Sequence, residues 1–113
     1  MTGPKHDERR KFERVTMPKA SPVKVRNEDG KDLGPVTMIG RGGIQVQEAK
    51  PPEIGSEVRL TLIDTTEGIQ RSVDAVARNV IGGTFVGYEF QNLDADAAVE
   101  IGVIIGKYYS SAT

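Results

Sequence analysis

The sequence predicts a mainly β fold, a six-stranded antiparallel β-barrel of the split-barrel type that ends in a C-terminal α-helix. One indication is that short segments of alternating apolar and polar residues recur between residues 23 and 90. Glycine and proline turns separate these segments, which is typical of an all-β barrel. Beyond residue 94 the apolar spacing changes to that of a helix.

The predicted strands are short, with one exception. The strand expected at 69–80 is the longest, and its apolar face carries Val73, Ala75 and Ala77. A tight turn at 82–83, formed by two glycines, separates it from the last strand. The six predicted strands cover residues 23–26, 36–39, 44–47, 58–63, 69–80 and 84–90.

Residues 95–109 are predicted to form a helix that packs on one side or on the mouth of the barrel. Asp94 can cap its N-terminus, and Asp96 suits the positive end of the helix dipole in the first turn. One face of the helix is apolar and includes Ala97, Ile101, Ile104, Ile105 and Tyr108.

Gly102 and Gly106 lie one turn apart on the same face of this predicted helix. A glycine costs a helix about 1 kcal/mol relative to alanine, so a packing reason is expected for the pair. We interpret the two glycines as sites of close packing on the barrel. A homodimer formed by helix–helix contact stays open as the alternative.

The bulk composition predicts one cytoplasmic domain. The chain has 113 residues and no cysteine, which excludes disulfides and thiolate metal sites. We expect a flexible tail at residues 1–8 and a single domain at 9–113. The polar N-terminus does not resemble a signal peptide, and the longest apolar run, 103–105, is too short for membrane insertion.

Charge is distributed unevenly along the chain. Residues 1–26 carry eight basic and three acidic residues, whereas residues 27–113 carry seven basic and thirteen acidic ones. A basic segment on an acidic body argues against general affinity for DNA, RNA or membranes. It permits a small anionic ligand that the basic segment holds locally.

Two segments carry most of the functional information. The first contains Arg9, Arg10 and Arg14. Arginine pairs with phosphates, bonds the O6 and N7 acceptors of guanine, and stacks on purine rings, so these residues suit a ligand with phosphates and guanines. The second segment, 38–43, has three glycines that permit close backbone approach and an anion-binding turn.

In this order, the two segments and the barrel pattern resemble the PilZ family across nearly the whole chain. The family's first motif is RxxxR, and Arg10 to Arg14 matches it in full, with Arg9 as an additional arginine. Its second motif is Asp or Asn, any residue, Ser, any two residues and Gly. At 38–43 only Gly43 matches that motif.

The resemblance implies binding of cyclic di-GMP. Arg10 and Arg14 would hold guanine edges and phosphates with help from Arg9, and Gly43 would keep the second loop tight against the ligand.

The second motif also departs from the family pattern. Met38 and Gly40 replace a polar residue and a serine, and the loss of two hydrogen bonds weakens binding about tenfold to a hundredfold. Arg41 is a cation that can compensate for this loss.

The chain shows no pattern typical of catalysis or of metal binding. We therefore predict a non-enzymatic receptor or adaptor that requires no cofactor and acts on a downstream protein partner. One alternative is a degenerate PilZ domain that binds protein instead of nucleotide. Another is a barrel that binds single-stranded nucleic acid, against which the acidic body and the 5% aromatic content count.

Overall fold

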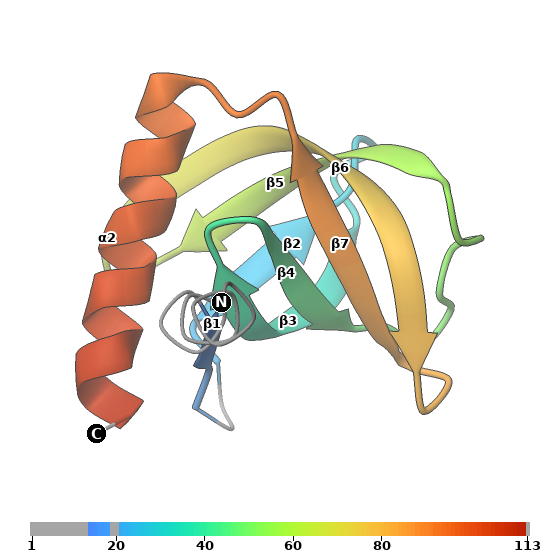
Figure 1. Cartoon of the computed structure of the whole chain (residues 1–113), viewed down its shortest axis with the longest axis horizontal. Coiled ribbons are helices and arrows are strands. Elements are labelled where there is room, and N and C mark those ends of the chain that lie inside the picture. The colour runs from blue at the N-terminus through green and yellow to red at the C-terminus, as the bar shows by residue number, and fades with distance from the viewer. Residues whose placement is uncertain (1–13, 19–20, 113) are drawn as a thin grey trace, which may run out of the picture.

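The computed structural model describes residues 14–18 and 21–112. In this part of the chain, the strands form one antiparallel sheet and a helix follows them (Figure 1). The elements are β1 (Arg14–Thr16), β2 (Val23–Arg26), β3 (Asp32–Gly40), β4 (Gly43–Gln47), β5 (Glu57–Asp64), β6 (Ile69–Ile81), β7 (Phe85–Gln91) and α2 (Ala95–Ala112).

Six of the strands close into a barrel. The first part of β3 pairs with β2 and its last part pairs with β4, so the order β3-β2-β5-β6-β7-β4 returns to β3. All of these pairings are antiparallel. The predicted six-stranded antiparallel barrel with a C-terminal helix is therefore confirmed.

The strand β1 is an addition that the sequence did not predict. It pairs with the end of β3, where Arg14 lies opposite Gly40 and Thr16 lies opposite Met38. Val15 between them is 2% exposed and joins the core. Only one residue of this three-residue strand faces the core. The strand is therefore too short to show an alternating pattern in the sequence.

The strand β3 begins earlier than the 36–39 segment that was predicted. It includes Gly34 and Pro35, which had been expected to precede the strand. Gly34 has φ +144°, and a Cβ there would lie 2.0 Å from the carbonyl oxygen of Gln47. Glycine is therefore required inside this strand because the backbones of β3 and β4 approach too closely for any side chain.

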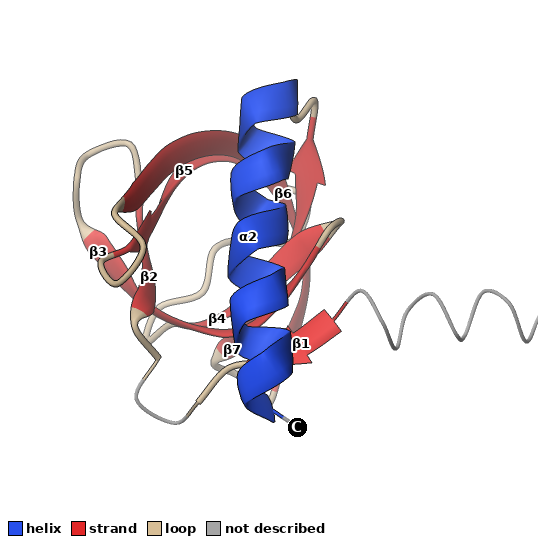
Figure 2. Ribbon diagram, turned by 90° about the vertical axis from the view of Figure 1, so that its left-hand side faces the viewer, coloured by secondary structure: helices blue, strands red, loops and turns tan. Residues whose placement is uncertain are grey.

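The core fills the barrel and extends to the helix. Fully buried side chains come from several strands, for example Val25, Leu60 and Val86, and from Ile101 and Ile104 of α2. Figure 2 shows α2 crossing the mouth of the barrel, where it packs against β1, β6 and β3. The expected position of the helix is therefore confirmed.

The start of α2 has the predicted cap. Oδ1 of Asp94 accepts a hydrogen bond from the backbone N–H of Ala97 at 2.7 Å. Asp96 lies in the first turn, where its charge suits the helix dipole. The helix ends at Ala112, three residues beyond the predicted end.

The interpretation that both helix glycines pack on the barrel is wrong for Gly106. Gly106 is exposed, and a Cβ there would meet no atom within 4 Å. Gly102 is half-buried, and a Cβ there would lie 3.7 Å from a guanidinium nitrogen of Arg41. The barrel side of the helix is instead filled by larger residues such as Ile104 and Ile105. The homodimer stays a prediction.

Within the described residues, α2 is the only helix, and it is not apolar enough over its length to span a membrane.

Candidate ligand-binding site

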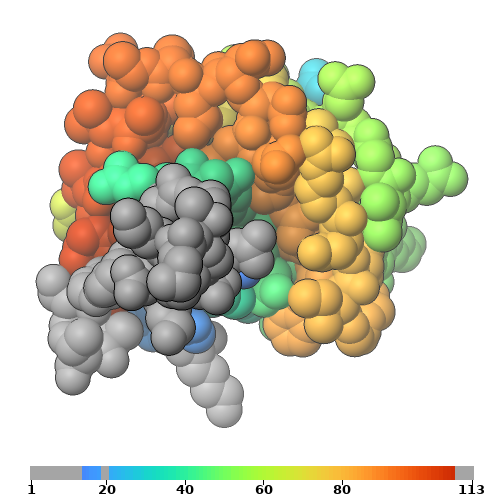
Figure 3. All heavy atoms as spheres, viewed as in Figure 1, coloured from blue at the N-terminus to red at the C-terminus, as the bar shows by residue number. Residues whose placement is uncertain are grey.

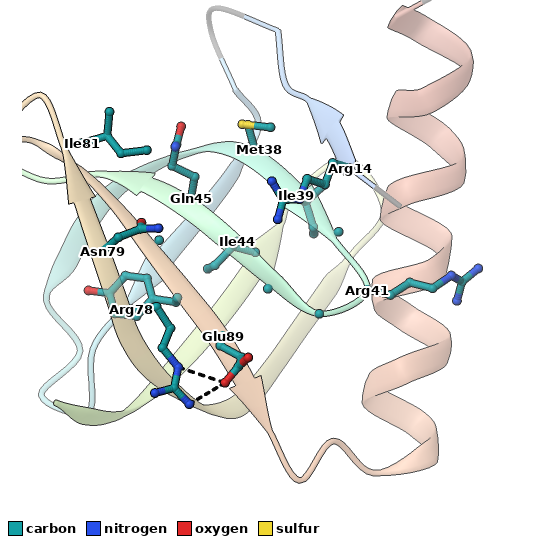
Figure 4. A pocket seen from close by; sticks show the side chains of 15 residues that line it. Arg14, Met38, Ile39, Arg41, Ile44, Gln45, Arg78, Asn79, Ile81 and Glu89 are labelled. Atoms are coloured by element: carbon teal, nitrogen blue, oxygen red, sulfur yellow. Dashed lines mark hydrogen bonds and ion pairs between the residues drawn. The ribbon is translucent and has the colours of Figure 1, made fainter. Parts of the chain in front are cut away.

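A pocket of about 460 Å³ lies on the outer face of the barrel, on the strands β1, β3, β4, β7 and β6 (Figure 4). Side chains alternate across these strands, so Ile39, Ile44 and Tyr88 enter the core while their neighbours face outward. The space-filling view shows atoms of the β3–β4 hairpin between α2 and β7 on this face (Figure 3). The volume is in the range of about 300–1,000 Å³ that is usual for small-molecule sites.

One row of residues across the pocket is almost bare of side chains at its centre. Arg14 of β1 lies opposite Gly40 of β3, Gly40 lies opposite Gly43 of β4, and Gly43 lies opposite Glu89 of β7. The row therefore has two residues without side chains, the buried Gly40 and the half-buried Gly43, between an arginine and a carboxylate. In Figure 4 the Arg14 side chain extends from β1 over the neighbouring strand β3.

A second row runs beside the first and carries uncharged side chains. Met38 of β3 lies opposite Gln45 of β4, Gln45 lies opposite Gly87 of β7, and Gly87 lies opposite Asn79 of β6. Oε1 of Gln45 accepts a hydrogen bond from the Thr37 hydroxyl at 2.9 Å. Apolar and amide groups thus alternate along this side of the pocket.

An ion pair closes the β6 side of the pocket. The guanidinium of Arg78 donates to Oε1 of Glu89 from both Nε (3.0 Å) and Nη2 (2.6 Å), as Figure 4 shows. Their side chains are 54% and 51% exposed. Exposed ion pairs contribute only about 0–1 kcal/mol, so Arg78 can exchange Glu89 for another anion at little cost.

Arg41 belongs to the pocket by its position in the β3–β4 turn but not by its side chain. Figure 4 shows its guanidinium directed toward α2, and Gly102 of the helix is its neighbour there. A ligand in the pocket would meet this guanidinium only after the side chain had rotated back.

Gly43 is required by the fold itself. A Cβ at this position would lie 2.0 Å from the carbonyl oxygen of Tyr88 on β7. The strands β4 and β7 therefore pair at this register only because residue 43 has no side chain.

Beneath the pocket, a buried hydrogen bond links β7 to the end of β4. The Tyr88 hydroxyl donates to Oε2 of Glu48 at 2.5 Å, and each residue is 4% exposed. Burial raises the pKa of Glu48, and the hydrogen bond from Tyr88 opposes this rise only partly. Burial and the nearby carboxylate likewise raise the pKa of Tyr88.

The chemistry of the pocket suits binding of an anion with polar ring edges. It has the cations Arg14 and Arg78, the amides of Gln45 and Asn79, and a backbone floor of glycines. Among the described residues, no three His, Cys, Asp or Glu side chains group together in a way that could hold a metal ion.

The model of the PilZ domain matches residues 8–106 of the chain. The chain belongs to the PilZ domain family. A comparison with curated proteins gives no match.

Several solved structures have a similar fold. The PilZ domain of YcgR from Escherichia coli, solved with c-di-GMP (cyclic di-GMP), has 19% identity and a TM-score of 0.69, with 88% of this chain and 90% of that chain covered. The MrkH–c-di-GMP complex of K. pneumoniae has 15% identity and a TM-score of 0.70, with coverage of 88% and 52%. The Bacillus subtilis motility inhibitor MotI has 17% identity and a TM-score of 0.56, with coverage of 80% and 45%.

The structure brings together those residues of the two PilZ motifs that it describes. Arg14 of the first motif adjoins Met38, Gly40 and Gly43 of the second at the pocket. Arg9 and Arg10 lie outside the described residues, as does the tail expected at 1–8.

Sequence reasoning missed the pocket residues of the later strands. Arg78, Asn79 and Glu89 lie far from both motifs in the sequence, and they reach the pocket only because β4, β6 and β7 pair. Gln45 lies two residues beyond the second motif and was missed as well. The one available signal was the polar pair at 78–79, which interrupts an otherwise apolar strand end.

Proposed function

We propose that this PilZ domain is a receptor for c-di-GMP that binds the ligand in the pocket on the outer face of the barrel. The observation that carries the proposal is the pairing of Arg14 with Gly40. This pairing joins the end of the RxxxR segment to the glycine turn of the second motif, which supports one pocket for both motifs. The c-di-GMP complexes of YcgR and MrkH, which have the same fold, support the choice of ligand.

The assignment of groups follows from the chemistry of the ligand, which has two phosphates and two guanines. Arg14, together with Arg9 and Arg10, pairs with phosphate oxygens and with the acceptor edge of guanine. Gly40 and Gly43 allow the ligand to approach the backbone, and Met38 packs against a purine face. Arg41 joins the site by rotating away from α2.

The proposed mechanism is a change of population and involves no chemical reaction. The ligand favours the arrangement in which the arginine segment lies against the pocket, and a downstream protein partner distinguishes this arrangement from the free one. We place the receptor in the cytoplasm, because a chain without cysteine is suited to a reducing compartment.

Isothermal titration calorimetry with c-di-GMP tests this proposal. We expect the wild type to bind at micromolar ligand and the Arg10→Ala/Arg14→Ala variant to lose at least tenfold in affinity, because charge-assisted hydrogen bonds are about 1.5–3 kcal/mol each. Arg59→Ala is the control, since Arg59 is an exposed arginine, at 54%, that pairs with Asp74 on β5 and β6 away from the pocket. A wild type that gives no heat at high micromolar ligand would refute the proposal.

Met38 and Gly40 favour a second candidate, a degenerate domain that binds protein and no nucleotide. Met38 is half-buried in the pocket row and offers no hydrogen bond where the family motif has a polar residue. The variant Met38→Asn/Gly40→Ser distinguishes the candidates if the wild type does not bind. A gain of c-di-GMP binding would support the degenerate domain, and no gain would count against it.

A further inference from the structure

An irregularity in β6 determines which side chains face the pocket. The β6–β7 register passes from Ala77 opposite Tyr88 to Asn79 opposite Gly87, so Arg78 is an extra residue in β6. In a bulge of this kind two residues oppose one, and the alternation of faces is interrupted. As a result Arg78 and Asn79 are both exposed, although strict alternation would place Asn79 on the core face with Ala77.

The position of the Asn79 side chain depends on Gly87. A Cβ added at Gly87 would lie 2.3 Å from Oδ1, 3.2 Å from Cγ and 3.6 Å from Nδ2 of Asn79. These three atoms of the Asn79 amide are the nearest to that Cβ. The oxygen end of the amide therefore lies against the bare backbone of β7, at the β6 end of the second pocket row, and Nδ2 lies farther from it.

The amide of Asn79 is available to a ligand. Its side chain makes no hydrogen bond with any residue in the described part of the chain, and Asn79 is exposed. An asparagine side chain offers two donors and one acceptor oxygen. Within the described residues neither kind of group has a hydrogen-bond partner, and Asn79 lines the pocket.

The other side chains of the row cannot offer the same combination. Met38 has no donor, and Gln45 already uses its carbonyl oxygen to accept from Thr37. Arg78 has only donors and the Glu89 carboxylate has only acceptors, and the two pair with each other. Asn79 is therefore the side chain of this wall that can donate and accept at the same edge of a base.

We propose that Asn79, whose amide occupies the space left by the missing side chain of Gly87, is a specificity-determining residue that reads a purine edge of the bound nucleotide. This inference rests on the proposed function, and it assigns to β6 the base recognition that Met38 cannot supply. Guanine presents O6 as an acceptor beside an N–H donor, whereas adenine presents an amino donor beside an acceptor. A fixed amide therefore distinguishes the two bases by the orientation of its two ends.

Calorimetry with c-di-GMP and with cyclic di-AMP provides the test. We expect Asn79→Ala to weaken c-di-GMP binding about five- to tenfold, and to lower the ratio of c-di-GMP to cyclic di-AMP affinity by a similar factor. Gln70→Ala is the control, because Gln70 is an exposed amide on β6 that does not line the pocket. Its affinity and selectivity should equal those of the wild type.

The role of Gly87 is tested by a double-mutant cycle. Gly87→Ala should displace the amide and reproduce the loss seen in Asn79→Ala, while the double variant should be no weaker than either single one. If Gly87→Ala does not fold, the double variant can be compared with Asn79→Ala instead. In the double variant the amide that the new methyl group would meet is absent.

The outcomes separate the two proposals. A wild type that binds c-di-GMP with an Asn79→Ala variant of unchanged affinity and selectivity would overturn the role of Asn79 alone. A wild type that does not bind c-di-GMP at all would overturn the proposed function, and the role of Asn79 with it.

Discussion

Tyr88 donates a hydrogen bond to Glu48 across 2.5 Å, and the two residues are buried where β4 ends beside β7. Because Glu48 lies away from bulk water, the hydroxyl is its hydrogen-bond donor in this environment. This pair stabilises the part of the barrel that supports the pocket floor.

Tyr88→Phe should destabilise the domain by about 1–3 kcal/mol, because it leaves a buried carboxyl group without its donor. Urea unfolding followed by circular dichroism measures the loss. The matched control is Tyr108→Phe, whose hydroxyl lies 3.3 Å from Asp64. Asp64 keeps its bonds from Thr66 and Glu67, so the control should lose less. Equal losses in the two variants would contradict this account.

The stability of the domain should depend on pH through Glu48. Burial raises the pKa of Glu48 above its ordinary value of 4.5, so the native state binds this proton more tightly than the unfolded chain does. The stabilisation is complete below pH 4.5 and is lost as pH rises through the raised pKa. Glu48→Gln cannot titrate, so its free energy of unfolding should fall less over this pH range. Parallel pH profiles for the two proteins would show that Glu48 does not contribute.

Gly43→Ala should destabilise the barrel by about 2 kcal/mol or more, since the added methyl group meets the Tyr88 carbonyl oxygen at 2.0 Å. A backbone atom cannot rotate away, so β4 and β7 must separate. The neighbouring Gly42→Ala is the control, because a Cβ there meets no atom within 4 Å. Thermal unfolding should leave Gly42→Ala within about 0.5 kcal/mol of the wild type. Similar stabilities for the two variants would be incompatible with this close approach.

Asp94→Ala should cost about 1 kcal/mol, because it removes the N-cap that accepts from the N–H of Ala97. Asp96→Ala, two residues later, removes only a favourable charge in the first turn and should cost about 0.3–1 kcal/mol. Urea unfolding of the two variants in low and in high salt compares them. The loss of stability in Asp96→Ala should become smaller in high salt, because salt screens the charge. A larger loss in Asp96→Ala than in Asp94→Ala would show that the cap contributes little.

The barrel and its helix could be predicted because their signals are local and repeated. Alternation over several residues marks strands such as β5, and the spacing of the core residues from Ile101 to Tyr108 marks α2. A three-residue strand has no such signal. The strand β1 is therefore recognisable only from its pairing with β3.

The pocket could be predicted only in part, because it is formed by pairing between distant strands. The motifs indicated Arg14 and Gly43 from the sequence. No local pattern indicated that Asn79 would lie opposite Gly87, since their pairing depends on a register shift. The direction of the Arg41 side chain likewise follows from the neighbouring helix and not from the turn that carries it.

The extra residue Arg78 in β6 changes which residue numbers face the core. Before it, Ala75 and Ala77 face the core, and after it Val80 packs against the core while Asn79 faces outward. Deleting Arg78 would let Asn79 directly follow Ala77, so regular alternation would keep Asn79 facing outward and Val80 facing the core, opposite the same residues of β7. The bulge therefore adds the Arg78 guanidinium to the wall of the pocket without changing the face of the residues on either side of it.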